Sequence, residues 1–371
     1  MISFTISHHI QEKLRKLESA ILAKYVFLTT LDRSTLDQMH SFAFISMIGA
    51  STRIENALLT DLEIKWIDTI LTQDSIPESF SQQKAVIENK LSKDKERSIE
   101  EVAGCRQLLL EIYGNFDQYL PLRESHLRTF HSLLLSPYQG AGPYVGRYKG
   151  LTNSVIETNA LTKKTKVIFK TADAGVITQC AMKDLLDWYN KEEWALPVVC
   201  EFIFRFLTIH PFQDGNGRLA RALTLLLLLQ SPHSQWSKVI SYLAIDRQIE
   251  KNKDEYYYVL NKCSNGKYSE DPTQYKINYF LDFIIKMLFL GLEDIDYYAK
   301  KIQLQKKLSA NAIQIMQCFE QNPQLRLSTM QIIEWTNIPR RTVINGLNIL
   351  LKNQFIQKLG QGRSVRYQLT F

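Results

Sequence analysis

Cysteine is scarce in this chain of 371 residues, and no two cysteines form a CxxC pair. The cysteines that occur are odd in number and scattered: Cys105, Cys180, Cys200, Cys263 and Cys318. This usage argues against a disulfide framework and against a zinc site, and it is typical of a reducing compartment. We therefore expect a cytoplasmic protein.

Long hydrophobic segments are missing as well. The opening stretch, MISFTISHHIQEKLRKL, turns polar within a few positions and so lacks the apolar core of a signal peptide. The longest apolar run, Leu225–Leu229 with its flanks, is too short to span a bilayer and is typical of a helix buried on all sides. We expect no membrane partner.

The chain does have an ordinary globular composition, but its charge is distributed unevenly. Hydrophobic residues make up 45% and charged residues 22%, as in soluble globular domains, and the length allows two or three domains. The net charge is +7, and residues 309–371 hold seven cationic side chains against two acidic ones. A basic C-terminal segment indicates an anionic partner for that part of the chain.

The periodicity of the apolar residues predicts a mainly helical protein. They recur every three or four positions in several segments, for example 10–27, 103–120 and 127–135. Glycine and proline cluster over 136–150, and the β-branched and aromatic residues that follow predict a β-hairpin ending near residue 172. A long helix over 275–307 is expected to lead to the basic C-terminal segment.

The segment HPFQDGNGRLAR, residues 210–221, lies between two apolar stretches and is too rich in polar groups for a simple turn. The preceding helix is predicted to end near Ile209, because Pro211 forces the chain out of it. The next helix, expected to begin at Arg218, adds its N-terminal dipole to the same place. A nest of backbone N–H groups that binds anions can form where successive residues take positive φ, as is possible for Gly215, Asn216 and Gly217.

Four side chains of this segment fit a polyphosphate. Arg218 and Arg221 are three residues apart on one helix, so they can reach more than one phosphate. Asp214 is expected to bind Mg²⁺ beside the phosphates, since Mg²⁺ takes one or two carboxylates. His210 can accept a proton near neutral pH, because the ordinary pKa of histidine is about 6.5. Together the four predict nucleotide chemistry.

The segment resembles the signature of the Fic family, HxFx[D/E]GNGRxxR, at every fixed position. Residues 146–171 resemble the hairpin or flap of that family, and 254–260 resemble its YYxxL segment. The resemblance implies a helical core that transfers AMP from ATP to a protein hydroxyl, with Mg²⁺ as cofactor. The intact GNGR turn separates the chain from family members that act as kinases.

The resemblance also implies a role for each site residue. His210 is expected to be the base that acts on the target hydroxyl, and Asp214 the Mg²⁺ ligand. Phe212 is expected to pack beneath the loop. The expected nucleotide-binding residues are Gly215, Asn216, Gly217, Arg218, Leu219, Ala220, Arg221, Asn252, Tyr256, Tyr257 and Leu260. Ser264 stands where some relatives have an asparagine.

Ser51 and Glu55, in the stretch ASTRIENALL, are similar to the inhibitory motif [S/T]xxxE[G/N] of the same family. They fall on one face of a helix, which suits a plug directed at an arginine. The resemblance implies that Glu55 pairs with Arg221 and holds the protein in an inhibited state. The alternative is a solvated glutamate on a helix surface.

The C-terminal segment resembles a winged helix: a helix over 328–337, a second over 340–355, then two strands. The second helix has an apolar stripe and an opposite polar stripe, as a recognition helix does. The candidates for binding DNA are Arg340, Arg341, Asn345, Asn348, Lys352, Arg363 and Arg366. The alternative is a small domain whose basic face contacts a protein.

We thus expect a mainly α protein with a Fic-type helical core, a β-hairpin flap, a helical N-terminal region and a C-terminal winged helix. The expected boundaries are 1–120, 121–270, 271–308 and 309–371. The leading function is a protein adenylyltransferase that acts on a Ser, Thr or Tyr hydroxyl, with the protein itself as one candidate target. The alternatives are a hydrolase that removes AMP, and a DNA-binding regulator whose core senses nucleotide. The sequence leaves a homodimer open.

Overall fold

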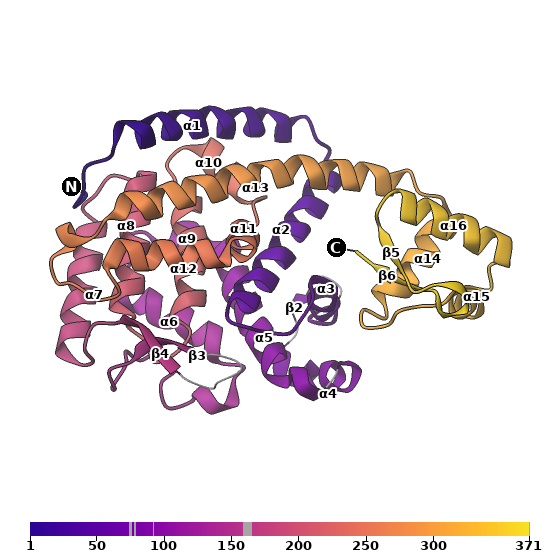
Figure 1. Ribbon diagram of the computed structural model, residues 1–371, viewed down its shortest axis with the longest axis horizontal. Coiled ribbons are helices and arrows are strands. Elements are labelled where there is room, and N and C mark those ends of the chain that lie inside the picture. Colours follow the sequence, from indigo (N-terminus) through magenta and orange to yellow (C-terminus); the bar gives the residue numbers. More distant parts are fainter. Residues whose placement is uncertain (74–75, 78, 92, 159–164, 371) are drawn as a thin grey trace. The chain divides into compact units, whose positions relative to one another are not determined.

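The computed structural model describes residues 1–370 except 74–75, 78, 92 and 159–164. Helices predominate (Figure 1), which confirms the mainly α prediction. By packing, the chain forms two units, residues 1–57 with 100–296 and residues 58–99 with 297–371. The boundaries expected from the sequence stay predictions. No helix in the described part of the chain combines the length and apolarity that a membrane crossing requires.

The first unit holds most of the helices and the hairpin β3 (Ser154–Thr158) with β4 (Thr165–Lys170). Helix α5 (Glu96–Asn115) enters it from the second unit, and α13 (Ile277–Lys306) leaves it. The remaining helices are α1 (His8–Thr29), α2 (Arg33–Ile54), α6 (Glu124–Leu135), α7 (Val176–Tyr189), α8 (Leu196–Ile209), α9 (Asn216–Leu229), α10 (Ser234–Ile240), α11 (Ile245–Lys251) and α12 (Lys253–Ser264).

The second unit contains short helices and two small antiparallel pairs of strands. Its elements are α3 (Asp61–Ile70), β1 (Thr72–Gln73), β2 (Ile76–Pro77), α4 (Phe80–Lys90), α14 (Ala310–Glu320), α15 (Thr329–Thr336), α16 (Arg340–Lys352), β5 (Ile356–Leu359) and β6 (Arg366–Leu369). Short 3₁₀ turns connect elements of both units: Lys93–Lys95, Phe116–Tyr119, Gln139–Ala141, Pro272–Gln274 and Gly362–Ser364.

Helix α9 lies at the centre of the first unit. From residue 218 to its end every residue is buried, so the leucine run is enclosed on all sides as its composition predicts. Helices α8 and α10 pack against it. Helix α1 lies beside α13 (Figure 1), and two ion pairs, Lys13 with Asp282 and Lys24 with Asp296, join them. The buried α9 gives the segment before it a rigid support.

The predicted hairpin is present as β3 and β4, which pair in antiparallel register from Ser154 opposite Lys170 to Thr158 opposite Thr165. The register shifts at Val155, which marks an irregularity in the ladder. Residues 159–164 of the expected flap lie outside the described part. The C-terminal end of β4 is fastened to the core, because the backbone of Lys170 bonds to that of Gly266 and Tyr268.

Helices α5 and α6 approach each other closely at Gly104. A Cβ atom there would lie 1.9 Å from the backbone oxygen of Leu134. We expect Gly104→Ala to push the helices apart and lower the free energy of unfolding by about 1–3 kcal/mol. Gly114 on the same helix meets nothing within 4 Å, so Gly114→Ala should stabilise by roughly 0.5–1 kcal/mol. Urea unfolding of both variants checks this, and an equal effect would contradict it.

Candidate functional site

Residues 210–215 of the motif form a loop between α8 and α9, and the ends of this loop lie close to their predicted places. Helix α8 ends at Ile209, and His210 takes a left-handed conformation with φ of 54°. The following helix begins at Asn216, two residues earlier than expected. The expectation of positive φ along the whole turn is therefore wrong: Gly215 has φ of 78°, whereas Asn216 and Gly217 already belong to the helix. The amides of its first turn remain available to an anion.

Asn216 closes this loop. Its Oδ1 accepts a hydrogen bond from the amide of Phe212 at 2.9 Å, and its Nδ2 donates to the carbonyl oxygen of Phe212 at 2.7 Å. The residue is 1% exposed. Because both ends of the side-chain amide are engaged, Asn216 holds the loop in shape, which also explains why the helix starts at this residue. The phosphate contact expected of its side chain stays a prediction.

His131 of α6, to which no sequence motif points, packs against the loop. Its ring stacks on Phe212 with 3.9 Å between the centroids and 8° between the planes. The amide of Gly146 donates to Nδ1 at 2.9 Å, so Nε2 carries the proton and donates to the carbonyl oxygen of Asp214 at 3.0 Å. Burial lowers the pKa of His131 to about 4. The neutral ring thus joins the base of the hairpin to the motif loop.

His210 is half-buried at the end of α8. Its Nδ1 lies 3.3 Å from the carbonyl oxygen of Leu207, which only accepts, so Nδ1 carries the proton and Nε2 keeps its lone pair. Burial, and then the charge of Lys149, lower its pKa to about 4. The imidazole is therefore neutral at pH 7 and able to accept a proton at Nε2.

Lys149 holds the segment before the hairpin against this loop, and no sequence pattern pointed to it. Its ammonium donates to the Thr171 hydroxyl at 2.8 Å and to the carbonyl oxygen of Ile209 at 3.1 Å. It also donates to Oδ1 of Asn153 at 3.0 Å. Burial lowers the pKa of Lys149 to about 8. At pH 7 a positive charge therefore lies next to His210.

Arg218 is a buried cation with unused donors. It is 4% exposed, and its nearest carboxylates are Asp214 at 3.5 Å and Glu101 at 3.8 Å. Its Nε and Nη1 have no hydrogen-bond partner among the described residues. Since buried charged donors without acceptors are costly, the geometry suits an anionic ligand. Asp214 is more open, with 41% of its side chain exposed at the mouth of the loop.

Arg221 is buried and surrounded by oxygen atoms. Its Nε donates to the Ser51 hydroxyl at 3.0 Å, and its Nη2 donates to the Ser51 carbonyl at 2.7 Å and to Oε1 of Glu55 at 2.9 Å. Asp246 of α11 lies 3.8 Å away. Burial alone would lower the pKa of Arg221, but Glu55 and Asp246 more than offset it and raise the pKa. The expected contact between the two motifs is thus present.

Glu55 lies directly over the first turn of α9. A Cβ atom on Gly217 would be 2.4 Å from Oε1 of Glu55. Glu55 itself follows the last residue of α2, and the next residue, Asn56, takes a left-handed conformation with φ of 71°. This explains why glycine or asparagine follows the glutamate in the pattern. A carboxylate therefore stands at a helix N-terminus beside an arginine, where the local field favours an anion.

Asp246 is a functional candidate that sequence reasoning missed. It is 1% exposed, and its Oδ1 has no hydrogen-bond partner among the described residues. Burial raises its pKa to about 6, although Arg221 and the hydroxyl of Ser51 lower it. Since this pKa lies below 7, the carboxyl group of Asp246 is ionised at pH 7. Its negative charge helps to balance the buried charge of Arg221.

The residues expected to contact the nucleoside differ in exposure. Tyr256 is 3% exposed and packs near Phe283 with 5.8 Å between the centroids, as a core aromatic does. Asn252, Tyr257 and Leu260 are half-buried, and Nδ2 of Asn252 donates to a backbone carbonyl within α11. Leu219 and Ala220 are buried in α9 and can offer only their backbone. The three half-buried residues retain surface for a ligand.

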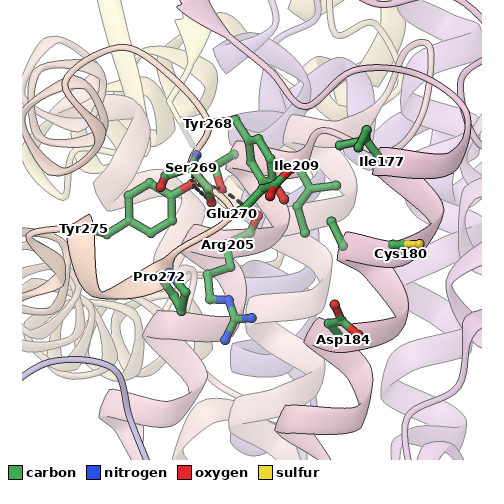
Figure 2. A pocket seen from close by; sticks show the side chains of 12 residues that line it. Ile177, Cys180, Asp184, Arg205, Ile209, Tyr268, Ser269, Glu270, Pro272 and Tyr275 are labelled. Atoms are coloured by element: carbon green, nitrogen blue, oxygen red, sulfur yellow. Dashed lines mark hydrogen bonds between the residues drawn. The ribbon is translucent and has the colours of Figure 1, made fainter.

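A cavity of about 290 Å³ lies beside Ile209, the residue before His210 (Figure 2). Arg205 lines the cavity. Its guanidinium is already engaged, because it lies 3.5 Å from Glu201 and 4.8 Å from the ring centre of Trp188. The carboxylates of Asp184 and Glu270 also line the cavity. With these acidic groups the cavity does not suit phosphates, so the motif loop stays the candidate for binding an anion.

The DNA-binding candidates lie in the second unit. The candidates on α16 all have exposed side chains: Arg340, Arg341, Asn345, Asn348 and Lys352. Arg366 of β6 is half-buried, and its Nη1 donates to the neighbouring carbonyl of Val365 at 3.0 Å. The side chain of Arg363 lies outside the described part.

A family model matches part of this chain, and solved structures are similar to it in fold. Residues 121–228 match the Fic/DOC family, so the chain contains a Fic domain. A Fic family protein from Desulfovibrio desulfuricans G20 matches with a TM-score of 0.57 and 21% identity, over 100% of this chain and 98% of that one. A Fic domain containing signaling protein from Bacteroides thetaiotaomicron VPI-5482 matches with a TM-score of 0.56 and 23% identity, over 78% and 97%. These likenesses show the fold.

Two further similarities are more distant or shorter. Fic-1 from C. elegans has a TM-score of 0.53 and 16% identity, over 80% of this chain and 73% of that one. The small chain of ribonucleoside-diphosphate reductase from Ostreid herpesvirus 1 (isolate France) is 38% identical over 68 residues, 15% of this chain. Because the chain spans only 12% of the length of that relative, this match carries no inference about activity.

The support that His131 gives to the loop can be tested through stability. His131→Phe keeps the stack but leaves the Gly146 amide and the Asp214 carbonyl unpaired, so we expect a loss of about 1–3 kcal/mol. Because the pKa of His131 is lowered to about 4, the native state of the wild type resists protonation between pH 6.5 and 4 while the unfolded chain does not. Its advantage over the variant should therefore shrink as the pH falls through this range.

Chemical unfolding at several pH values measures this difference. His9→Phe, at an exposed position of α1, is the matched control and should change little. A difference between wild type and His131→Phe that stayed constant from pH 7 to 4 would contradict the proposed role of the neutral ring.

Proposed function

We propose that the protein transfers AMP from ATP to a protein hydroxyl, and that Glu55 restrains this transfer. The motif loop supports the first part. Among the described residues, Arg218 offers buried donors without hydrogen-bond partners, and the first turn of α9 has no side-chain cap on its amides. His210 is a neutral base at the edge of the same loop. These groups suit a polyphosphate next to a reacting hydroxyl.

The position of Glu55 is the observation that carries the proposal. Its carboxylate lies over Gly217 and 2.9 Å from Nη2 of Arg221, so it takes up the place that favours an anion at the start of α9. A terminal phosphate of ATP fits the same place by charge and by its oxygen acceptors. The two anions therefore compete for one arginine, and competition of this kind inhibits.

The reaction follows from the groups present. The target oxygen attacks the α-phosphorus, a new P–O bond forms, and the bond from the α-phosphorus to the bridging oxygen breaks, so that pyrophosphate leaves. The proton of the hydroxyl passes to Nε2 of His210, whose Nδ1 stays bound to Leu207. Arg218 and the amides of α9 stabilise the charge on the phosphates. Burial, and then the charge of Lys149, lower the pKa of His210 and so keep the base neutral beforehand.

Asp214 suits a Mg²⁺ ion at this loop. Mg²⁺ takes one or two carboxylates and completes its shell with phosphates and water, and Asp214 is a partly exposed carboxylate within reach of Arg218. When bound, the ion would neutralise part of the phosphate charge.

The hairpin supports the docking of an extended target segment. Among the described strands, β3 pairs with β4 alone, and the end of β4 is fastened by Gly266 and Tyr268. An extended segment can add to such an edge and bring its hydroxyl towards His210.

Two alternative functions predict different outcomes in the same assays. In a hydrolase, Glu55 would position water and release AMP from a modified protein, whereas in a nucleotide sensor ATP would bind without turnover. Labelled ATP and, separately, a protein carrying AMP are incubated with the purified chain. Transfer of label to protein supports the proposal, while release of AMP or binding without products supports one of the alternatives.

The base is tested by His210→Ala. We expect transfer to fall by ~10²–10⁴-fold, because the hydroxyl keeps its proton and stays a poor nucleophile. Calorimetry should show that ATP with Mg²⁺ still binds to this variant, since the phosphate contacts come from other residues. His9→Ala serves as the matched control. Full transfer by His210→Ala would remove the proposed mechanism.

The restraint is tested by Glu55→Gln, which removes the charge but keeps the size. We expect incorporation of AMP into the protein itself to rise by up to ~10²-fold, because Arg221 becomes free to align the phosphates and small misplacements cost that much. Arg221→Ala should lower transfer whether or not Glu55 is changed. Glu18→Gln, an exposed position on α1, is the matched control. A Glu55→Gln rate equal to wild type would show that Glu55 is no inhibitor.

A further inference from the structure

Helix α16 of the second unit has two opposite faces. Val343, Leu347 and Leu350 are buried in a core that α14 and the strands share. Gly346 lets α16 approach α14 closely, since a Cβ atom there would be 2.5 Å from Cδ1 of Ile315. The buried face therefore fixes how the helix is oriented within its own domain, and the outer face is presented rigidly.

The outer face carries cations, amides and one apolar group. Asn345 and Asn348 lie in its middle with Ile344, which is 41% exposed. Arg341 stands near the start of the helix and Lys352 at its end. A helix of this length spans roughly 20 Å, so cations at its two ends can reach separate phosphates while the centre faces bases.

From α16 onwards the charged residues are all cationic. No acidic residue follows Glu334 in the sequence, whereas six cationic residues do: Arg340, Arg341, Lys352, Lys358, Arg363 and Arg366. Glu320, the other acidic residue after 308, lies 2.8 Å from Lys65. A face without carboxylates is complementary to a polyanion.

Two paired strands follow α16 in the same domain. β5 and β6 pair in antiparallel register, and Leu327 joins them through two backbone hydrogen bonds with Tyr367. Lys358 is exposed on β5. The order α15, α16 and hairpin resembles that of a winged helix, and in helix-turn-helix proteins the second helix lies in the major groove.

We propose that this domain binds duplex DNA through α16 and reads A·T base pairs in the major groove. Asparagine forms two hydrogen bonds with adenine, and an apolar side chain contacts the methyl group of thymine. Asn345, Asn348 and Ile344 supply both kinds of contact from one face. The proposal is independent of AMP transfer, because none of its residues belongs to the motif loop.

The full chain is tested on duplexes of about 25 base pairs with a randomised centre, selected at low and moderate salt. Binding should fall steeply with salt, because phosphate contacts release counterions, and the selected sequences should be enriched in A·T pairs. Asn345→Ala with Asn348→Ala should remove a preference of roughly 5- to 150-fold while salt-dependent binding remains. Arg341→Ala with Lys352→Ala should weaken binding to all sequences and lower the salt slope by about two.

The matched control removes two exposed cations from α1, Arg15→Ala with Lys16→Ala, and should leave binding unchanged. Thermal unfolding confirms that each variant is folded. Three results would overturn the proposal. They are the absence of binding at low salt, an equal loss of binding in the control variant, and selected sequences that show no preference in either the wild type or the asparagine variant. In the first case the face belongs to a protein contact.

Discussion

The buried guanidinium of Arg221 is the charge around which the site is arranged. Its position in a fully buried helix requires oxygen atoms from elsewhere, since an unpaired buried cation would be too costly. Glu55 and Ser51 come from the end of α2, and Asp246 comes from α11. One side chain thereby fixes three helices against one another. The same balance makes the site sensitive, because any change in one of the anions alters how firmly Arg221 is held.

Much of the loop could be predicted from local sequence. The end of α8 and the presence of a turn follow from Pro211 and the glycines, whose effects on the backbone are local. The sequence pattern predicts a start of α9 that is two residues too late, because the side-chain amide of Asn216 closes the loop through its contacts with Phe212. Periodicity also predicted the main helices and the hairpin, as these depend on neighbouring residues.

Other parts of the site could not be predicted, because they depend on long-range contacts. His131, Lys149 and Asp246 lie in segments whose patterns are those of ordinary helices or loops. Each acquires its role through partners far away in the sequence, such as Asp214 for His131 and Ile209 for Lys149. No spacing rule connects such pairs in a single sequence. The pKa values of the histidines follow from this burial, so they too become visible only in the folded chain.

The exposure of Glu55 and Arg221 bears on how the proposed restraint would act. The side chain of Arg221 is 3% exposed and is also held by Ser51 and Asp246, whereas the side chain of Glu55 is 34% exposed at the end of α2. A partly exposed carboxylate contributes little binding free energy, because water screens it. It is therefore the partner that moves. Under the proposed function, Glu55 would then inhibit by misaligning a bound nucleotide, since a screened single charge would not exclude a polyphosphate that Arg218 and the amides of α9 also hold.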